Sequence, residues 1–76
     1  MVRERLFADR WEYLHAGASA ISVADRFART CFAEPQTVME YDLQGDGIKW
    51  SMTFKLRGSD KPYTLSGSGG RWVITW

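Results

Sequence analysis

The stretch Ile48-Lys49-Trp50-Ser51-Met52-Thr53-Phe54-Lys55-Leu56-Arg57 decides the fold, because apolar and polar residues alternate at every position. Successive side chains of a strand point to opposite faces of a sheet, so this period of two predicts a strand with one buried face. Its even-numbered residues should face a core and its odd-numbered residues should face water. The stretch carries no catalytic or cofactor motif.

A partner strand is predicted at residues 37–44, where apolar and polar residues again alternate. The connecting residues 44–47, Gln-Gly-Asp-Gly, tolerate positive φ, so the two strands should form a hairpin. The expected register places every large apolar side chain of the hairpin on one face. It pairs Leu43 with Ile48, Asp42 with Lys49, Tyr41 with Trp50 and Met39 with Met52.

Two further strands are predicted at residues 63–68 and 71–76, each preceded by a turn that contains glycine. Four strands in chain order form an antiparallel meander, in which the last strand, Arg71–Trp76, lies at an edge. The unpaired backbone groups of an edge strand can pair with another strand. One hypothesis is therefore a homodimer formed through Arg71–Trp76, and the alternative is a short edge strand that stays unpaired.

The first third of the chain is predicted to be helical. Phe7, Trp11 and Leu14 recur at spacings of four and three, which places them on one face of a helix over residues 3–15. Ser22-Val23-Ala24-Asp25 has the pattern of a capping box, so a second helix should begin at Val23 and end before Pro35. The apolar stripe of this second helix contains Ala20, Ala24, Phe27, Ala28 and Cys31.

The predicted fold class is α+β: two N-terminal helices pack on one face of a four-stranded antiparallel meander, in the order ααββββ and in two layers. A chain of 76 residues has room for a single domain, residues 1–76. The expected core consists of large apolar side chains from both layers: Phe7, Trp11, Leu14, Phe27, Cys31, Tyr41, Trp50, Met52, Phe54, Leu65, Trp72 and Ile74.

Composition limits the classes of partner. Ten Lys and Arg against nine Asp and Glu give a net charge of +1, which lacks the strong positive footprint of dedicated DNA-binding proteins. One Cys and one His cannot form a structural zinc site or an internal disulfide, which favours a reducing compartment. The first residues lack the apolar region of a signal peptide, and no apolar run is long enough to cross a bilayer. We therefore expect a cytoplasmic protein with no membrane partner, located in the host cytoplasm if phage-encoded.

No arrangement of residues indicates catalysis. His15 is interpreted as a solvated residue at the end of the first helix, and Cys31 as a small buried side chain. Asp46 and Asp60 fit turns. The glycine-rich segments join strands, whereas phosphate loops connect a strand to a helix. We expect no enzyme activity, no cofactor and no bound metal.

The surface offers one candidate site, the sheet face opposite the helices. Such a face is either an ordinary solvated face, as antiparallel sheets commonly have, or a surface that binds an acidic protein or a nucleic-acid backbone. Base stacking is not expected, because the aromatic side chains fall on the other face. The candidate partner-binding residues are the cations Lys49, Lys55, Arg57 and Arg71, with Glu40 and Asp42 as an acidic margin.

Two helices before a hairpin also suggest a winged-helix DNA-binding domain, in which residues 22–33 would form the recognition helix. That fold normally contains a third helix. Arg26 and Arg29 are the only expected exposed cations on this segment. The winged-helix alternative is therefore disfavoured.

In size and architecture the chain resembles the anti-CRISPR proteins, small inhibitors encoded by phages and mobile elements. The resemblance is carried by the charged segment Arg3–His15 followed by the hairpins of residues 37–76. It implies a noncatalytic protein that inhibits a protein complex of a bacterial host by steric occlusion. These proteins share no motif, so no residue role can be transferred. The alternative is a small DNA- or RNA-binding regulator, whose affinity would fall steeply with salt.

Overall fold

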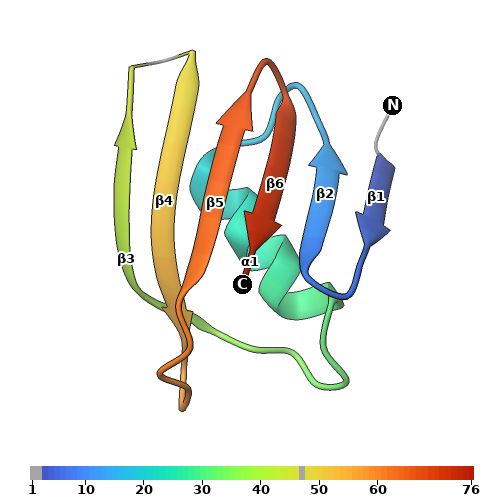
Figure 1. Cartoon of the computed structure of the whole chain (residues 1–76), viewed down its shortest axis with the longest axis vertical. Helices are drawn as coiled ribbons and strands as arrows, with labels where there is room; N and C mark the ends of the chain where they lie inside the picture. The colour runs from blue at the N-terminus through green and yellow to red at the C-terminus, as the bar shows by residue number, and fades with distance from the viewer. Residues whose placement is uncertain (1–2, 47) are drawn as a thin grey trace.

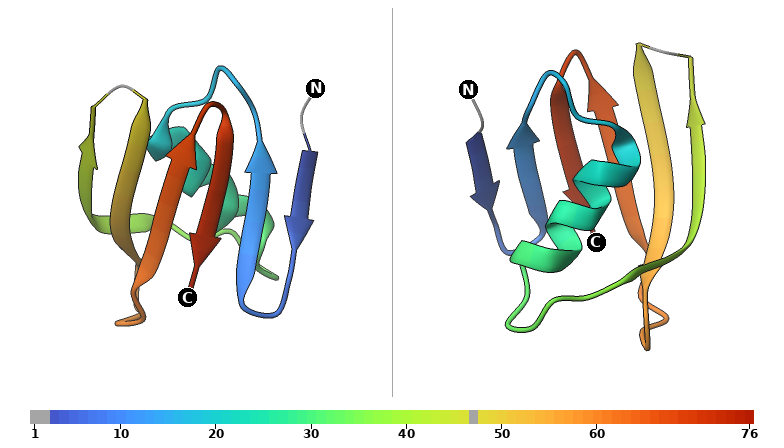
Figure 2. Two further views of the ribbon diagram at one scale, coloured as in Figure 1. Left: turned by 45° about the horizontal axis from the view of Figure 1, so that its top comes forward. Right: turned by 180° about the vertical axis from the view of Figure 1, so that it is seen from behind.

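The computed structural model describes residues 3–46 and 48–76, which form one six-stranded antiparallel sheet and one helix (Figure 1). The helix, α1 (Ala20–Thr30), crosses one face of the sheet, and the opposite face is uncovered (Figure 2). We call the uncovered side the open face. The sheet order is β1-β2-β6-β5-β4-β3. The strands are β1 (Arg3–Leu6), β2 (Arg10–Leu14), β3 (Val38–Gly45), β4 (Lys49–Leu56), β5 (Tyr63–Ser68) and β6 (Arg71–Thr75).

The prediction of a helix over residues 3–15 is wrong, and so is the two-helix ααββββ class. This segment is a hairpin of β1 and β2, closed by a hydrogen bond from the Phe7 N–H to the Arg10 carbonyl at 2.8 Å. Trp11 and Tyr13 alternate with polar residues along β2, and both aromatic rings are buried under α1. Because β2 pairs with β6, burial of two aromatic rings at a period of two outweighs the helical spacing.

The helix is present but begins earlier than predicted. Ser19 is its N-cap: the Ser19 Oγ accepts the Ser22 N–H at 3.3 Å, and the Ser22 Oγ accepts the Ser19 N–H at 3.0 Å. This reciprocal pair is a capping box, so the box assigned to Ser22 and Asp25 is wrong. The helix ends before Pro35, as expected. Its buried side consists of Ala20, Val23, Ala24, Phe27 and Ala28.

The alternation in β4 is confirmed. Met52, Phe54 and Leu56 are buried on the helix side, and Trp50 is half-buried there. The strands β3 to β6 lie side by side in chain order, so the antiparallel meander is also confirmed. Phe27 lies over this layer, with its ring centroid 5.5 Å from that of Tyr63 and 6.2 Å from that of Phe54.

The predicted register of the first meander hairpin is wrong. Leu43 pairs with Met52 rather than with Ile48, because the turn closes at Asp46, whose Oδ1 accepts the N–H groups of Ile48 and Lys49, each at 2.9 Å. The predicted turn also includes Gly47, which lies outside the described residues. The correct pairing keeps the even-numbered residues of β4 on the helix side, so the assignment of faces survives the shift.

A bulge in β3 moves Tyr41, an expected core residue, and Met39, which the expected register placed on the same face, to the surface. The register shifts between Met39 and Asp42, and Glu40 has a φ of 50°. Met39 then pairs with Lys55 on the open face, and Tyr41 is 51% exposed. A bulge opposes two residues of one strand to one residue of the other and so changes the face on which the following residues lie.

The strand Arg71–Trp76 is not at an edge, which contradicts the prediction. β6 (Arg71–Thr75) lies between β5 and β2 and pairs with both. The edges of the sheet are β1 and β3. A homodimer formed by pairing at β6 therefore has no free strand edge to use.

Candidate functional site

Antiparallel pairing aligns the side chains of the open face in rows across the sheet. The row nearest the start of β1 contains one residue from each of five neighbouring strands, and we call it the terminal row. The strand ends that carry it gather at the upper end of the sheet in Figure 1. From β1 to β4 the terminal row reads Arg3, Leu14, Arg71, Ser68 and Lys49.

The terminal row itself carries three cations and no carboxylate, but Asp46, in the turn after β3, adjoins Lys49: its Oδ1 accepts the Lys49 backbone N–H at 2.9 Å. Arg3, Lys49 and Arg71 are exposed, and none makes an ion pair with another described residue. Arg5, which lies beside Arg3 on the same side of β1, likewise makes no ion pair within residues 3–46 and 48–76. One end of the open face therefore presents four cations that make no direct ion pair with a carboxylate of residues 3–46 and 48–76.

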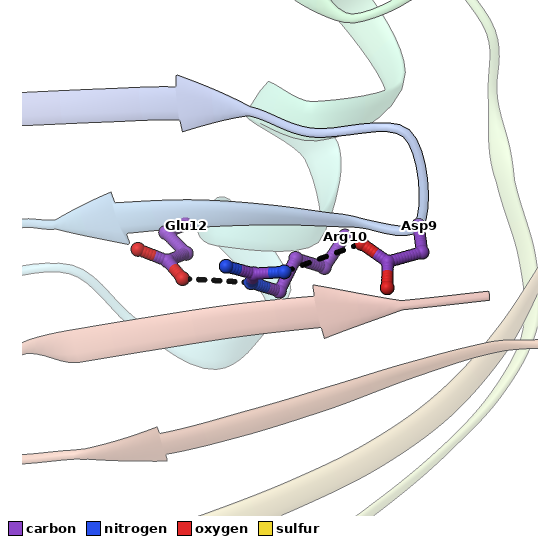
Figure 3. A network of polar contacts seen from close by, with 3 residues as sticks. All are labelled: Asp9, Arg10 and Glu12. Atoms are coloured by element: carbon purple, nitrogen blue, oxygen red, sulfur yellow. Dashed lines mark hydrogen bonds and ion pairs between the residues drawn. The ribbon is translucent and has the colours of Figure 1, made fainter.

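Glu12 lies on the open face opposite Arg5, one row from this end, and another residue already binds it. The Arg10 Nε donates to the Glu12 Oε2 at 2.9 Å, and the Arg10 Nη1 contacts the Asp9 Oδ1 at 3.3 Å (Figure 3). The Arg10 hydrogen bond lowers the pKa of Glu12, and the charges of Arg71 and Arg5 lower it further. Glu12 thus offsets part of the charge of Arg5 and Arg71 at longer range, but its direct ion pair is with Arg10, so Arg5 and Arg71 can still contact an outside anion.

Two hollows of the open face meet at Arg71. The first, of about 240 Å³, is lined by cations and carboxylates together with Tyr13 and Leu14: Arg3, Arg5 and Arg71 on the one hand, Glu4 and Glu12 on the other. The second, of about 390 Å³, is lined by residues that include Lys49 and Val73. Arg71 contributes to both. Arg71 of the terminal row therefore lies between two hollows, into which side chains of a partner can fit.

The structure separates the candidate residues that the sequence predicted. Lys49 and Arg71 lie in the terminal row, and Asp42 lies on the open face opposite Thr53 of β4. Lys55, Arg57 and Glu40 gather around a hollow at the opposite end of β4. In that group Lys55 Nζ contacts Glu40 Oε2 at 3.7 Å. The single candidate site predicted on the sheet face is therefore two separate charged regions, and the Lys55–Glu40 ion pair partly neutralises the second.

Sequence reasoning missed the cations of β1 and β2, because it assigned them to a helix. The segment Arg10–Leu14 alternates Trp11 and Tyr13 with polar residues, and this is the signal that could have revealed a strand. The structure places Arg3 and Arg5 on the same open face as Arg71, two strands away from it, which a helical first segment would not do.

The remaining candidate groups have structural surroundings. Burial raises the pKa of the Cys31 thiol, which keeps it protonated at neutral pH. His15 follows β2 instead of ending a helix, and its Nδ1 accepts the Gly17 N–H at 3.2 Å. Within the described ranges, no group of three or more His, Cys, Asp or Glu side chains could hold a metal ion.

Comparisons with protein-family models, with curated proteins and with solved structures gave no match. Across residues 3–46 and 48–76, no helix has both the length and the apolar character needed to cross a membrane. The class of protein that the fold and face support is therefore a small, mostly β domain with a cationic open sheet face.

Proposed function

We propose that the protein is a noncatalytic binding protein that inhibits a protein complex of a bacterial host by steric occlusion, in the manner of anti-CRISPR proteins. The supporting observation is the group of cations Arg3, Arg5, Lys49 and Arg71 at one end of the open face. Like charges gathered on one face repel one another, so the arrangement favours contact with an anionic partner.

The distribution of charge on the open face favours a protein partner over a polyanion. The terminal row is cationic, whereas Asp42 on β3 adds negative charge at the far edge. A nucleic-acid backbone is negative along its whole length and would be repelled there. A protein surface can carry both signs and so can complement both regions.

The test measures inhibition in cells. The protein is expressed in a panel of bacterial strains that carry different nuclease-based defence complexes, and the efficiency of phage plating is measured. We expect the wild-type protein to raise plating in a susceptible strain and the double variant Arg71→Glu/Lys49→Glu to lose this effect. The matched control is Arg29→Glu, a charge reversal on the exposed side of α1.

Circular dichroism of each purified variant verifies that it is folded. Equal inhibition by the wild-type protein and by the Arg71→Glu/Lys49→Glu variant would contradict a role for the open face. Failure of the wild-type protein to affect any strain of the panel would contradict the inhibitory function itself.

The second candidate is a small DNA- or RNA-binding regulator, which the absence of a carboxylate in the terminal row supports. If Arg3, Arg71 and Lys49 each neutralise one phosphate, log K should fall with log salt at a slope of about −2 to −3. Gel-shift assays with single-stranded and duplex oligonucleotides at two salt concentrations measure this slope. A slope in this range that becomes shallower in Arg71→Glu would favour the regulator.

A further inference from the structure

The terminal row alternates cations with uncharged side chains from strand to strand. Leu14 lies between Arg3 and Arg71, and Ser68 lies between Arg71 and Lys49. Neighbouring strands are about 4.8 Å apart, so successive cations are about 10 Å apart and the row is about 19 Å long. Leu14 is 40% exposed, so an apolar side chain lies at the surface between two cations.

The spacing of the terminal row matches one face of an α-helix. A helix rises about 1.5 Å per residue, so side chains one heptad apart on the same face are about 10.5 Å apart. Side chains three or four residues apart are about 5 Å apart, close to the distance from one strand of the row to the next. An extended peptide presents side chains on one side about every 6.7 Å, which does not match the cations.

The exposed apolar group distinguishes a helix from a nucleic-acid backbone. A phosphate backbone is charged at every step and offers Leu14 only the sugar carbons between two phosphates, not an apolar side chain. A helix with acidic residues one heptad apart can place an apolar residue between them, directly over Leu14. Half-buried Val73, which lines the second hollow beside Arg71, extends this apolar contact.

We propose that the open face recognises an acidic amphipathic α-helix, laid across the strands along the terminal row. Its three acidic residues, one per heptad, contact Arg3, Arg71 and Lys49, and an apolar residue between the first two packs on Leu14. The two hollows on either side of Arg71 receive the flanking side chains of the helix. This inference rests on the proposed function and specifies the chemistry of the partner.

The test uses two synthetic peptides of about three heptads each, with identical composition and a helix-favouring background. The phased peptide has one Glu per heptad and a Leu between the first two Glu residues. In the scattered peptide the same residues are spaced so that they spread around the helix. Binding to the full-length protein is measured by fluorescence anisotropy, and amide shifts from NMR locate the contact.

We expect the phased peptide to bind at least about tenfold more tightly than the scattered peptide, because only the phased one can pair all three charges at once. Arg71→Glu should weaken binding of the phased peptide by a similar factor, whereas Arg29→Glu should leave it unchanged. Leu14→Ser should weaken the phased peptide without altering the salt dependence of its binding. Amide shifts should change at Arg3 and Leu14 and stay constant along α1.

Equal affinity for the two peptides, or amide shifts confined to α1, would overturn the helical partner. The proposed function would still stand if Arg71→Glu/Lys49→Glu abolished inhibition in cells. Binding of single-stranded or duplex oligonucleotides with no binding of either peptide would overturn both proposals.

Discussion

Gly67 and Trp72 form a cross-strand pair whose packing leaves no room for a methyl group. Gly67 of β5 lies opposite Trp72 of β6, and a Cβ added to Gly67 would be 2.2 Å from the Trp72 Cε3. Trp72 is 4% exposed, and its Nε1–H donates to the His15 carbonyl at 3.3 Å. The indole therefore cannot swing away from the glycine without losing both its burial and this hydrogen bond.

The substitution Gly67→Ala should destabilise the fold. Overpacking of a well-packed site costs about 1–3 kcal/mol. The lower entropy of the unfolded alanine chain offsets about 0.4–1 kcal/mol of this cost. The net loss in free energy of unfolding is about 1–2 kcal/mol, which lowers the melting temperature of a domain this size by roughly 5–15 °C.

Thermal and urea unfolding, followed by circular dichroism, measure this loss, and the near-ultraviolet signal reports on the surroundings of the indole. The control is Ser66→Ala, at the neighbouring exposed position on the open face, which should change stability by less than about 0.5 kcal/mol. Gly45→Ala is a second comparison with Gly67→Ala. Its Cβ would be 2.0 Å from the Trp50 ring, but Trp50 is half-buried and can rotate outward, whereas Trp72 cannot.

We therefore expect Gly45→Ala to cost less than Gly67→Ala, although the added methyl approaches the ring slightly more closely. Unchanged stability in Gly67→Ala, or a larger loss in Gly45→Ala than in Gly67→Ala, would refute this account of the packing.

Three further predictions concern the helix cap, an ion pair and the core. Ser19→Ala should lower the free energy of unfolding, measured in urea, by about 1 kcal/mol, because it removes the N-cap side chain. Asp25→Asn should lower it clearly less. A larger loss in Asp25→Asn than in Ser19→Ala would indicate that the N-cap is Ser22 instead. Arg10→Gln should raise the pKa of Glu12 toward its ordinary value of 4.5 in an NMR titration, and an unchanged pKa would exclude Arg10 as the cause. Because the pKa of Glu12 is lower in the folded state, its contribution to stability is present above the unfolded pKa and is lost as pH falls through the folded pKa. Glu12→Gln should therefore weaken the dependence of the free energy of unfolding on pH in the acidic range. Phe27→Ala should lower the free energy of unfolding by about 3–5 kcal/mol, because its ring lies at the centre of the core. Cooperative thermal unfolding of this variant near the wild-type melting temperature would contradict that central place.

The strand β4 and the meander could be predicted because their signal is local. Each large apolar side chain from Trp50 to Leu56 is followed by a polar one, and glycine-containing turns delimit the later strands. The helix α1 was also recognisable from its stripe of small residues around Phe27. Its cap was misplaced because Ser19 and Ser22 both fit an N-cap, and their mutual hydrogen bonds depend on where the preceding chain lies.

The β1–β2 hairpin could not be decided from local pattern. In Arg10–Leu14, Trp11 and Leu14 fit a helical spacing while Trp11 and Tyr13 fit a strand, and the segment is too short to separate the two periods. The deciding contact is pairing of β2 with β6, far along the chain. The bulge at Glu40 was equally hidden, since a positive φ at a residue other than glycine leaves no compositional trace.

The candidate site was predicted in part for the same reason. Lys49 and Arg71 were placed on the correct face by the alternation of β4 and β6. Arg3 and Arg5 were missed with the hairpin that carries them. The grouping of cations at one end of the sheet is thus a property of the tertiary fold.

The central claim is that residues 3–14 form a hairpin which adds Arg3 and Leu14 to the row that contains Arg71. Backbone nuclear Overhauser effects in the uniformly labelled protein test it most directly. We expect cross-strand contacts between Leu14 and Arg71 and between Arg3 and Leu14, with strong sequential Hα–HN contacts along β1 and β2. A continuous series of HN–HN contacts over residues 3–14, with none to Arg71, would show a helix there and contradict both the fold and the terminal row.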